Sequence, residues 1–223
     1  MLWLLLACTP PKSDPPDSAT DSASLRDSEE APALGALSGD CPALTSVWAS
    51  TAPGAFQNRI GLTNGFDETL LSEDGTTVWT TENLGGSSEE SEVVSFEVLF
   101  GCEGADLLAT EAQLTYTDEG KKGDLLVEVW GHPLLVSVTR GFNYPDPEGG
   151  LTVEAATNLL EKKLSGLDEA EDFLEQEHDR ALLHVIAWGD ADATALAEAW
   201  EGVDQRDLLL MVTVTDGNDG ALY

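Results

Sequence analysis

The residues best suited to chemistry in this 223-residue chain are acidic and amide side chains near its C-terminus. Asp216, Asn218 and Asp219 stand close together, with Gly217 and Gly220 between and after them. Oxygen ligands at such tight spacing are typical of calcium-binding loops, although the later bidentate Glu of an EF-hand is absent here. The sequence therefore offers Asp216, Asn218 and Asp219 as a candidate Ca²⁺ site, with a plain acidic turn as the alternative.

A second pair of carboxylates, Asp190 and Asp192, follows Gly189 between an apolar run and an expected helix. In parallel sheets, ligands bind beyond the carboxyl ends of the strands. These two carboxylates are therefore a second candidate cation site. The alternative is a turn in which Asp192 caps the helix.

The three histidines have no catalytic spacing. His132 precedes a proline in an expected turn, His178 ends an acidic segment, and His184 lies inside an apolar run. We expect one turn histidine, one surface histidine and one hydrogen-bonded core histidine. The chain also lacks the HExxH, GxSxG, P-loop and GxGxxG motifs. The sequence thus predicts no catalytic residue and no cofactor other than Ca²⁺.

The C-terminal third has helical periodicity. Apolar residues recur at helical spacing from Val153 to Leu164, and Gly166 is placed to end that helix. Asp168 begins a pattern that resembles a capping box and predicts a second helix, to about residue 179. The expected order after it is strand, helix and strand, over 181–188, 192–200 and 208–215.

Before residue 143 the pattern is that of β structure. Runs rich in Val, Phe and Trp predict antiparallel strands over 77–81, 91–100, 112–117, 124–130 and 134–142. The segment 143–150, with prolines and paired glycines, is an internal break. A β-rich part followed by helices defines an α+β fold. Because the piece after the break is too short for much core of its own, we expect one domain over 41–223.

The first eight residues have the pattern of a targeting signal. A short apolar run ends in Leu5-Leu6-Ala7-Cys8, which resembles the lipobox of bacterial lipoproteins. The resemblance covers residues 1–8 and implies a signal peptide that is removed, with Cys8 as the lipidated first residue of the mature chain. Because the run is short and no basic residue precedes it, we expect the natural start to lie upstream. The alternative is a cytosolic protein with an apolar N-terminus.

Residues 9–40 are rich in Pro, Ser, Asp and Glu and contain no aromatic residue. Such a composition buries too little apolar surface to offset the entropy lost on ordering, so we expect a disordered acidic tether. Thr9 is not the Asp associated with inner-membrane retention. The resemblance therefore implies an outer-membrane lipoprotein that faces the periplasm or the cell surface, held by its acyl chains.

The export that this resemblance implies also bears on the cysteines. With Cys8 lipidated, Cys41 and Cys102 are left as a pair, and an oxidising compartment favours a disulfide between them. Closing a loop of about 60 residues would stabilise the fold by about 4 kcal/mol. The alternative is two unrelated buried thiols.

Charge and aromatic content restrict the partners. The chain has 42 Asp and Glu against 10 Lys and Arg, a formal net charge of −32. Such a field repels phosphate backbones and anionic headgroups, so we expect no nucleic-acid partner and a membrane contact through lipid alone. The six tryptophans are expected mainly in the core, although an exposed one would suit stacking on cell-wall sugars.

These features predict a lipid-anchored cell-envelope protein whose acidic domain has a structural or binding role towards a protein or cell-wall partner. Two alternatives stay open. An envelope hydrolase requires a histidine and acids to converge in a pocket near the C-terminal helices. A calcium-stabilised adhesion-type module requires the carboxylates of 216–219 to bind Ca²⁺.

Overall fold

The computed structural model describes residues 34–62, 65–82, 89–144, 146–217 and 220–223, and residues 31–223 form one compact unit. Its strands are β1 (Ala36–Gly39), β2 (Gly54–Leu62), β3 (Asp106–Thr110), β4 (Leu125–Val129), β5 (His132–Gly141), β6 (Arg180–Ala187) and β7 (Leu209–Gly217). Its α-helices are α1 (Glu73–Thr80), α2 (Glu89–Glu103), α3 (Val153–Phe173) and α4 (Asp190–Trp200). A 3₁₀-helix, η1 (Leu44–Ala49), lies between β1 and β2.

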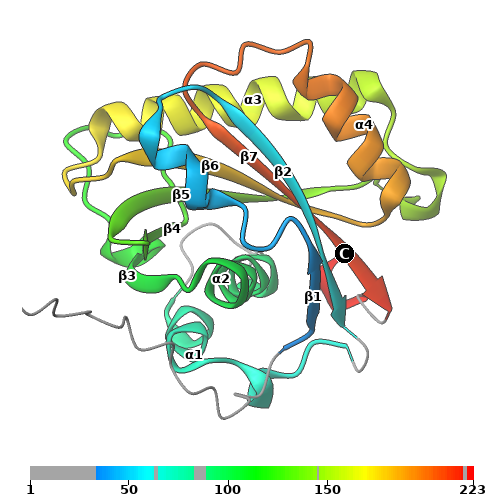
Figure 1. Ribbon diagram of the computed structural model, residues 1–223, viewed down its shortest axis with the longest axis horizontal. Coiled ribbons are helices and arrows are strands. Elements are labelled where there is room, and N and C mark those ends of the chain that lie inside the picture. Colours follow the sequence, from blue (N-terminus) through cyan, green and yellow to red (C-terminus); the bar gives the residue numbers. More distant parts are fainter. Residues whose placement is uncertain (1–33, 63–64, 83–88, 145, 218–219) are drawn as a thin grey trace, which may run out of the picture. The chain divides into compact units, whose positions relative to one another are not determined.

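The strands form one mixed sheet in the order β1-β2-β7-β6-β5-β4-β3. The central strands β2, β7, β6 and β5 are parallel, whereas β1, β4 and β3 each pair antiparallel with a neighbour. The helices α3 and α4 cover one face of the sheet, and α1 and α2 lie on the other (Figure 1). Each face carries its own apolar layer. The fold is therefore α+β, as predicted.

The predicted strands at the centre of the sheet are confirmed. The segments 124–130 and 134–142 correspond to the hairpin of β4 and β5, and 181–188 and 208–215 correspond to β6 and β7. Strands covered on both faces read as nearly continuous apolar runs, and these runs stand out in the sequence.

Two predicted strands, 77–81 and 91–100, are wrong, because both segments are helical. The hydroxyl of Ser72 caps α1 by accepting from the N–H of Gly75 at 2.9 Å. The next helix, α2, is buried along nearly all of its length. Polar residues such as Ser95 and Glu97 are buried in α2 together with its valines, so the sequence shows the alternation of a strand and no helical periodicity.

The predicted strand over 112–117 is also wrong. This segment holds a 3₁₀ turn and a single bridge between Tyr116 and Leu174, while the strand β3 lies just before it.

The predicted helix end at Gly166 is wrong as well, since α3 continues to Phe173 with Leu167 and Ala170 buried against the sheet. Burial of these side chains outweighs the cost of about 1 kcal/mol for a glycine inside a helix.

The folded region begins earlier than residue 41. Leu34 is buried, and β1 pairs with β2 from Ala36 opposite Gly61 to Gly39 opposite Asn58. The tether prediction is therefore wrong for 34–40, because composition does not reveal backbone pairing at a sheet edge. Residues 1–33, with the expected signal peptide and Cys8, lie outside the described residues.

The predicted disulfide between Cys41 and Cys102 is present, with 4.8 Å between the two Cα atoms. Cys41 lies just before η1, and Cys102 lies in the last turn of α2. The bridge thus ties the start of η1 to the helix that covers the sheet.

Asp124, which precedes β4, is a desolvated carboxyl group packed beside β5. Its N–H donates to the carbonyl of Val136 at 2.8 Å, and its carboxylate accepts from the N–H of Val138 at 2.5 Å. Desolvation raises the pKa of Asp124 to about 6, although the bond from Val138 and the charge of Lys163 act in the opposite direction.

Replacing Asp124 by Asn is expected to change the dependence of stability on pH. The folded-state pKa of about 6 lies above the ordinary value of 3.8, so wild type gains stability as pH falls between these values and loses it as pH rises. The variant lacks this gain. Urea denaturation should show the free energy of unfolding of wild type rising by about 2 kcal/mol relative to that of Asp124→Asn as the pH falls from 7 to 4. A difference that stays constant with pH would contradict the assignment.

Candidate functional site

The described histidines lie in separate places. His184 in β6 is fully buried, with Nδ1 2.7 Å from Ser95 Oγ and Nε2 2.6 Å from Thr213 Oγ1. Burial lowers the pKa of His184 to about 3, so the ring is neutral. His178 Nε2 lies 3.4 Å from Glu171 Oε1, and this hydrogen bond raises the pKa of His178. The expected core role of His184 is thus confirmed, whereas the side chain of His178 is 16% exposed and lies beside Glu171 instead of open at the surface.

The contact between Ser95 and His184 has the form of a nucleophile beside a base, but it has no access to a substrate. Both residues are fully buried. From His184 the hydrogen bonds continue through Thr213 to Asn58, with the hydroxyl of Thr213 donating at 2.5 Å. This chain links α2 to β6, β7 and β2, so its role is to hold the helix on the sheet.

The turn between β4 and β5 presents aromatic side chains at the edge where the parallel strands begin. Its two residues, Trp130 and Gly131, both have positive φ, at 56° and 81°. Turns of this kind match the twist of a hairpin and favour Asn or Gly at both positions, so a tryptophan there is unusual. Trp130 is 57% exposed, and His132 follows as the first residue of β5.

A hollow of about 470 Å³ lies beside His132. The rings of Trp48 and His132 stack with 4.6 Å between their centroids and 11° between their planes. His132 Nδ1 lies 2.6 Å from Asp179 Oδ2, and both of these side chains are partly exposed. We call this the His132 hollow. Its lining residues are Trp48, Ala49, Ser50, Thr51, His132, Asp179 and Arg180.

Arg180, the first residue of β6, fixes the loop that forms one wall of this hollow. The side chain is buried, and its guanidinium donates to four backbone carbonyls at 2.6–3.2 Å. These carbonyls belong to Val47, Ser50, Ala52 and Asp207. Charge-assisted bonds of this kind are strong when shielded from water. They hold the segment that carries Trp48 and Ser50 against the sheet.

Two buried N–H groups of the lining residues have no hydrogen-bond partner within the described part of the chain. They are Nε1 of Trp48 and Nε of Arg180. Nearly all buried polar groups in native proteins are satisfied by protein, water or ligand. The His132 hollow therefore combines an aromatic wall with a partly exposed carboxylate, and the two unsatisfied donors lie buried beneath its surface.

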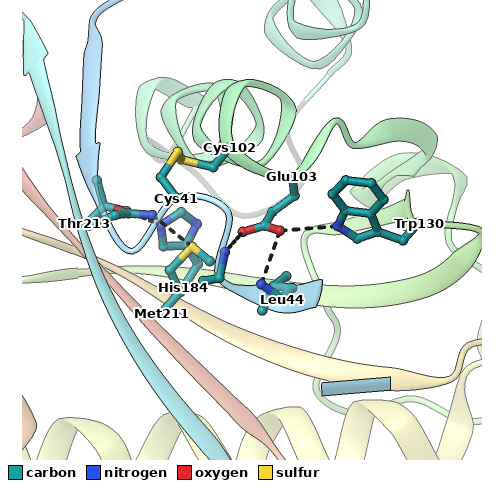
Figure 2. Close-up of a disulfide and its surroundings, with 10 residues drawn as sticks. Cys41, Leu44, Cys102, Glu103, Trp130, His184, Met211 and Thr213 are labelled. Atoms are coloured by element: carbon teal, nitrogen blue, oxygen red, sulfur yellow. Dashed lines mark hydrogen bonds between the residues drawn. A yellow bond between two sulfur atoms is a disulfide. The ribbon is translucent and has the colours of Figure 1, made fainter. Parts of the chain in front are cut away.

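A second hollow, of about 320 Å³, includes the β4–β5 turn itself. At its base, the buried carboxylate of Glu103 accepts from the N–H groups of Ala43 at 2.6 Å and Leu44 at 3.2 Å, and from the indole N–H of Trp130 at 3.5 Å (Figure 2). Figure 2 also shows the Cys41–Cys102 disulfide beside Glu103. We call this the Trp130 hollow. Its lining residues are Pro42, Cys102, Glu103, Gly104, Asp106, Glu128, Trp130 and Gly131.

The carboxylates of the second candidate cation site, Asp190 and Asp192, are bonded to other groups of the protein. The carboxylate of Asp192 accepts from the N–H of Leu151 at 2.6 Å and from the N–H of Gly189 at 3.1 Å. Asp190 forms an ion pair with Arg59. With these carboxylates engaged at the start of α4, the alternative of a turn and cap is the one that the structure supports.

The candidate Ca²⁺ site stays a prediction, because Asn218, Asp219 and the side chain of Asp216 lie outside the described residues. Elsewhere in the described chain, no group of three or more His, Cys, Asp or Glu side chains is arranged to hold a metal ion. The helices of that same part include none with the length and apolar character of a membrane span.

Comparison with known proteins adds little about function. No family model matches the chain, and no solved structure matches it. Over 140 residues it is 36% identical to a Dictyostelium discoideum protein described as "AAC-rich mRNA clone AAC4 protein". The match covers 59% of this chain and 20% of the relative, so the chain spans only a minor part of that protein's length.

Proposed function

We propose that this protein is a lipid-anchored protein of the bacterial envelope whose domain binds a partner through the edge of the sheet that carries the His132 and Trp130 hollows. The observation that carries the binding role is the aromatic display at this edge. Trp130 is largely exposed in a turn that normally favours small residues, and the stacked pair of Trp48 and His132 lines the adjoining surface.

The proposed location has separate support. A disulfide such as Cys41–Cys102 is typical of proteins that fold in an oxidising compartment. The lipobox-like Leu5-Leu6-Ala7-Cys8 would supply the anchor, and the strongly acidic chain favours attachment through lipid over a basic face. An outer-membrane position facing the periplasm or the cell surface fits these features.

One experiment tests the anchor and the binding role together. The full gene, with any upstream start restored, is expressed as wild type and as Cys8→Ala in a Gram-negative host. We expect mass spectrometry to find a diacylated Cys8 at the mature N-terminus of wild type only. The unlipidated Cys8→Ala protein should still sediment with isolated cell envelopes, and Trp48→Ala plus Trp130→Ala should reduce the bound fraction several-fold.

Two results would contradict the proposal. If wild type is found in the cytosolic fraction with an unprocessed Met1, the proposed lipid anchor is wrong. If the double variant, checked by circular dichroism to be folded, sediments as much as the protein with both tryptophans, the proposed binding surface is wrong.

A hydrolase is the second candidate function, and the pairing of His132 with Asp179 favours it. Nδ1 is bonded to the carboxylate of Asp179, which directs Nε2 away from it as the nitrogen available for general-base catalysis. The pair lies at the start of β5 and β6, away from the C-terminal helices where a hydrolase site was expected. If wild type releases product from a bound polymer and His132→Gln does not, the result would favour a hydrolase over a protein that only binds.

A further inference from the structure

We propose that the His132 hollow binds a neutral sugar residue of a glycan. This inference rests on the proposed binding function and names the chemistry of the ligand. It starts from the stacked rings of Trp48 and His132, because an aromatic wall presents a flat apolar face of the kind that packs against the C–H groups of a pyranose ring.

The charges that surround the hollow favour a neutral ligand. Asp179, half-exposed at its rim, disfavours an anion, and the net charge of −32 does so at longer range. The buried guanidinium of Arg180, beside the hollow, disfavours a cation. A polar molecule without net charge meets neither repulsion.

The hydrogen-bonding groups suit a molecule that both donates and accepts. The hydroxyls of Ser50 and Thr51, which line the hollow, can donate, whereas the unpartnered N–H groups of Trp48 and Arg180 are buried beneath its surface. The lining side chains also supply acceptors, the Asp179 carboxylate and the free Nε2 of a His132 ring whose Nδ1 is bonded. Sugar hydroxyls match such a mixture, because each can donate one hydrogen bond and accept others. A volume of about 470 Å³ lies within the range of small-ligand sites.

The same lining favours binding over cleavage. Glycoside hydrolysis ordinarily needs two carboxyl groups on opposite sides of the scissile bond. Among the residues that line the His132 hollow, Asp179 supplies the one carboxylate. The hollow therefore has the groups to hold a sugar but lacks the usual pair to hydrolyse it.

Titration calorimetry on the full chain in detergent tests this inference. The probes are the tetramer of β-1,4-linked N-acetylglucosamine, cellotetraose and maltotetraose, all neutral. We expect at least one to bind, with Trp48→Ala and Asp179→Asn each weakening it by at least about tenfold. Trp48→Phe, which keeps a ring for stacking, should stay within about threefold of wild type. Tyr144→Ala is the matched control, because it removes an exposed aromatic side chain that lines neither hollow, and it should leave the Kd unchanged.

The outcomes separate this inference from the proposed function. Absence of binding by all three sugars, or equal binding by wild type and Asp179→Asn, would overturn the sugar site. If the unlipidated protein nevertheless sediments with envelopes through Trp48 and Trp130, the proposed function stands without it. Should Trp48→Ala fail to fold, Asp179→Asn still decides, because that substitution is nearly isosteric.

Discussion

Replacing Cys41 and Cys102 together by serine is expected to lower the free energy of unfolding by about 4 kcal/mol. The disulfide joins residues 61 positions apart, and a cross-link over a loop of this length removes that much chain entropy from the unfolded state. In a domain of this size the loss corresponds to a fall in Tm of about 10 °C. Urea denaturation and thermal melts under non-reducing conditions measure both quantities.

The third cysteine provides the control for this experiment. Cys8→Ser makes the same chemical change at a residue outside the bridge and should leave the stability of the folded domain unchanged. Reduction of wild type by dithiothreitol should reproduce the effect of the double variant. A loss below about 1 kcal/mol would contradict the entropic argument, since the chain-entropy model predicts several times more.

Loss of the bridge should also loosen η1 and, with it, the His132 hollow. Cys41 and the Glu103 carboxylate hold the start of η1, whereas Arg180 holds its end. Without the disulfide, hydrogen bonds and the packing of Leu44, Val47 and Trp48 on the core still connect this segment to the domain, but no covalent link fixes its start. Faster amide hydrogen exchange over 43–52 in the double variant should therefore accompany the global loss of stability.

The centre of the sheet was predictable because its sequence signals are local. Gly131 lies in the turn between β4 and β5, and β6 and β7 are nearly continuous apolar runs between polar segments. The helix α2 was not predictable by the same rule. Val93, Val94 and Val98 indicate a strand by propensity, but contacts with the sheet and with α1 bury them in a helix. Tertiary packing here overrides local preference.

The candidate site was not predictable, because it joins distant parts of the chain. Trp48 follows β1, His132 begins β5, and Arg180 begins β6; only the order of strands in the sheet brings them together. Each residue alone has an ordinary structural interpretation. The one local signal was Trp130-Gly131, a bulky residue in the two-residue turn of a hairpin, and it became informative once the register of β4 and β5 was known.

Replacing His184 by Leu is expected to destabilise the protein by about 4 kcal/mol at pH 7. The ring accepts from Ser95 at Nδ1 and donates from Nε2 to Thr213, whose own hydrogen is committed to Asn58. Leucine leaves two buried hydroxyls each short of a partner, at a cost of about 1–3 kcal/mol apiece, and fits the cavity imperfectly. Urea denaturation at pH 7 measures this difference in the free energy of unfolding.

The same comparison at lower pH tests the protonation state of His184. Its folded-state pKa of about 3 lies below the ordinary value of 6.5, so the stability that it contributes is present above pH 6.5 and is lost as pH falls towards 3. The advantage of wild type over His184→Leu should therefore shrink by about 3 kcal/mol between pH 7 and pH 4.

Ser95→Ala is the matched control, because it removes one hydrogen bond of the same network without removing the titrating ring. Its cost should change little over this pH range, and a parallel result for His184→Leu would contradict a buried, neutral histidine. Wild type alone would not reveal the effect. Protonation of Asp124 stabilises the folded state over much of the same range in which His184 destabilises it, so the two contributions largely cancel in the intact protein and become visible only against their own variants.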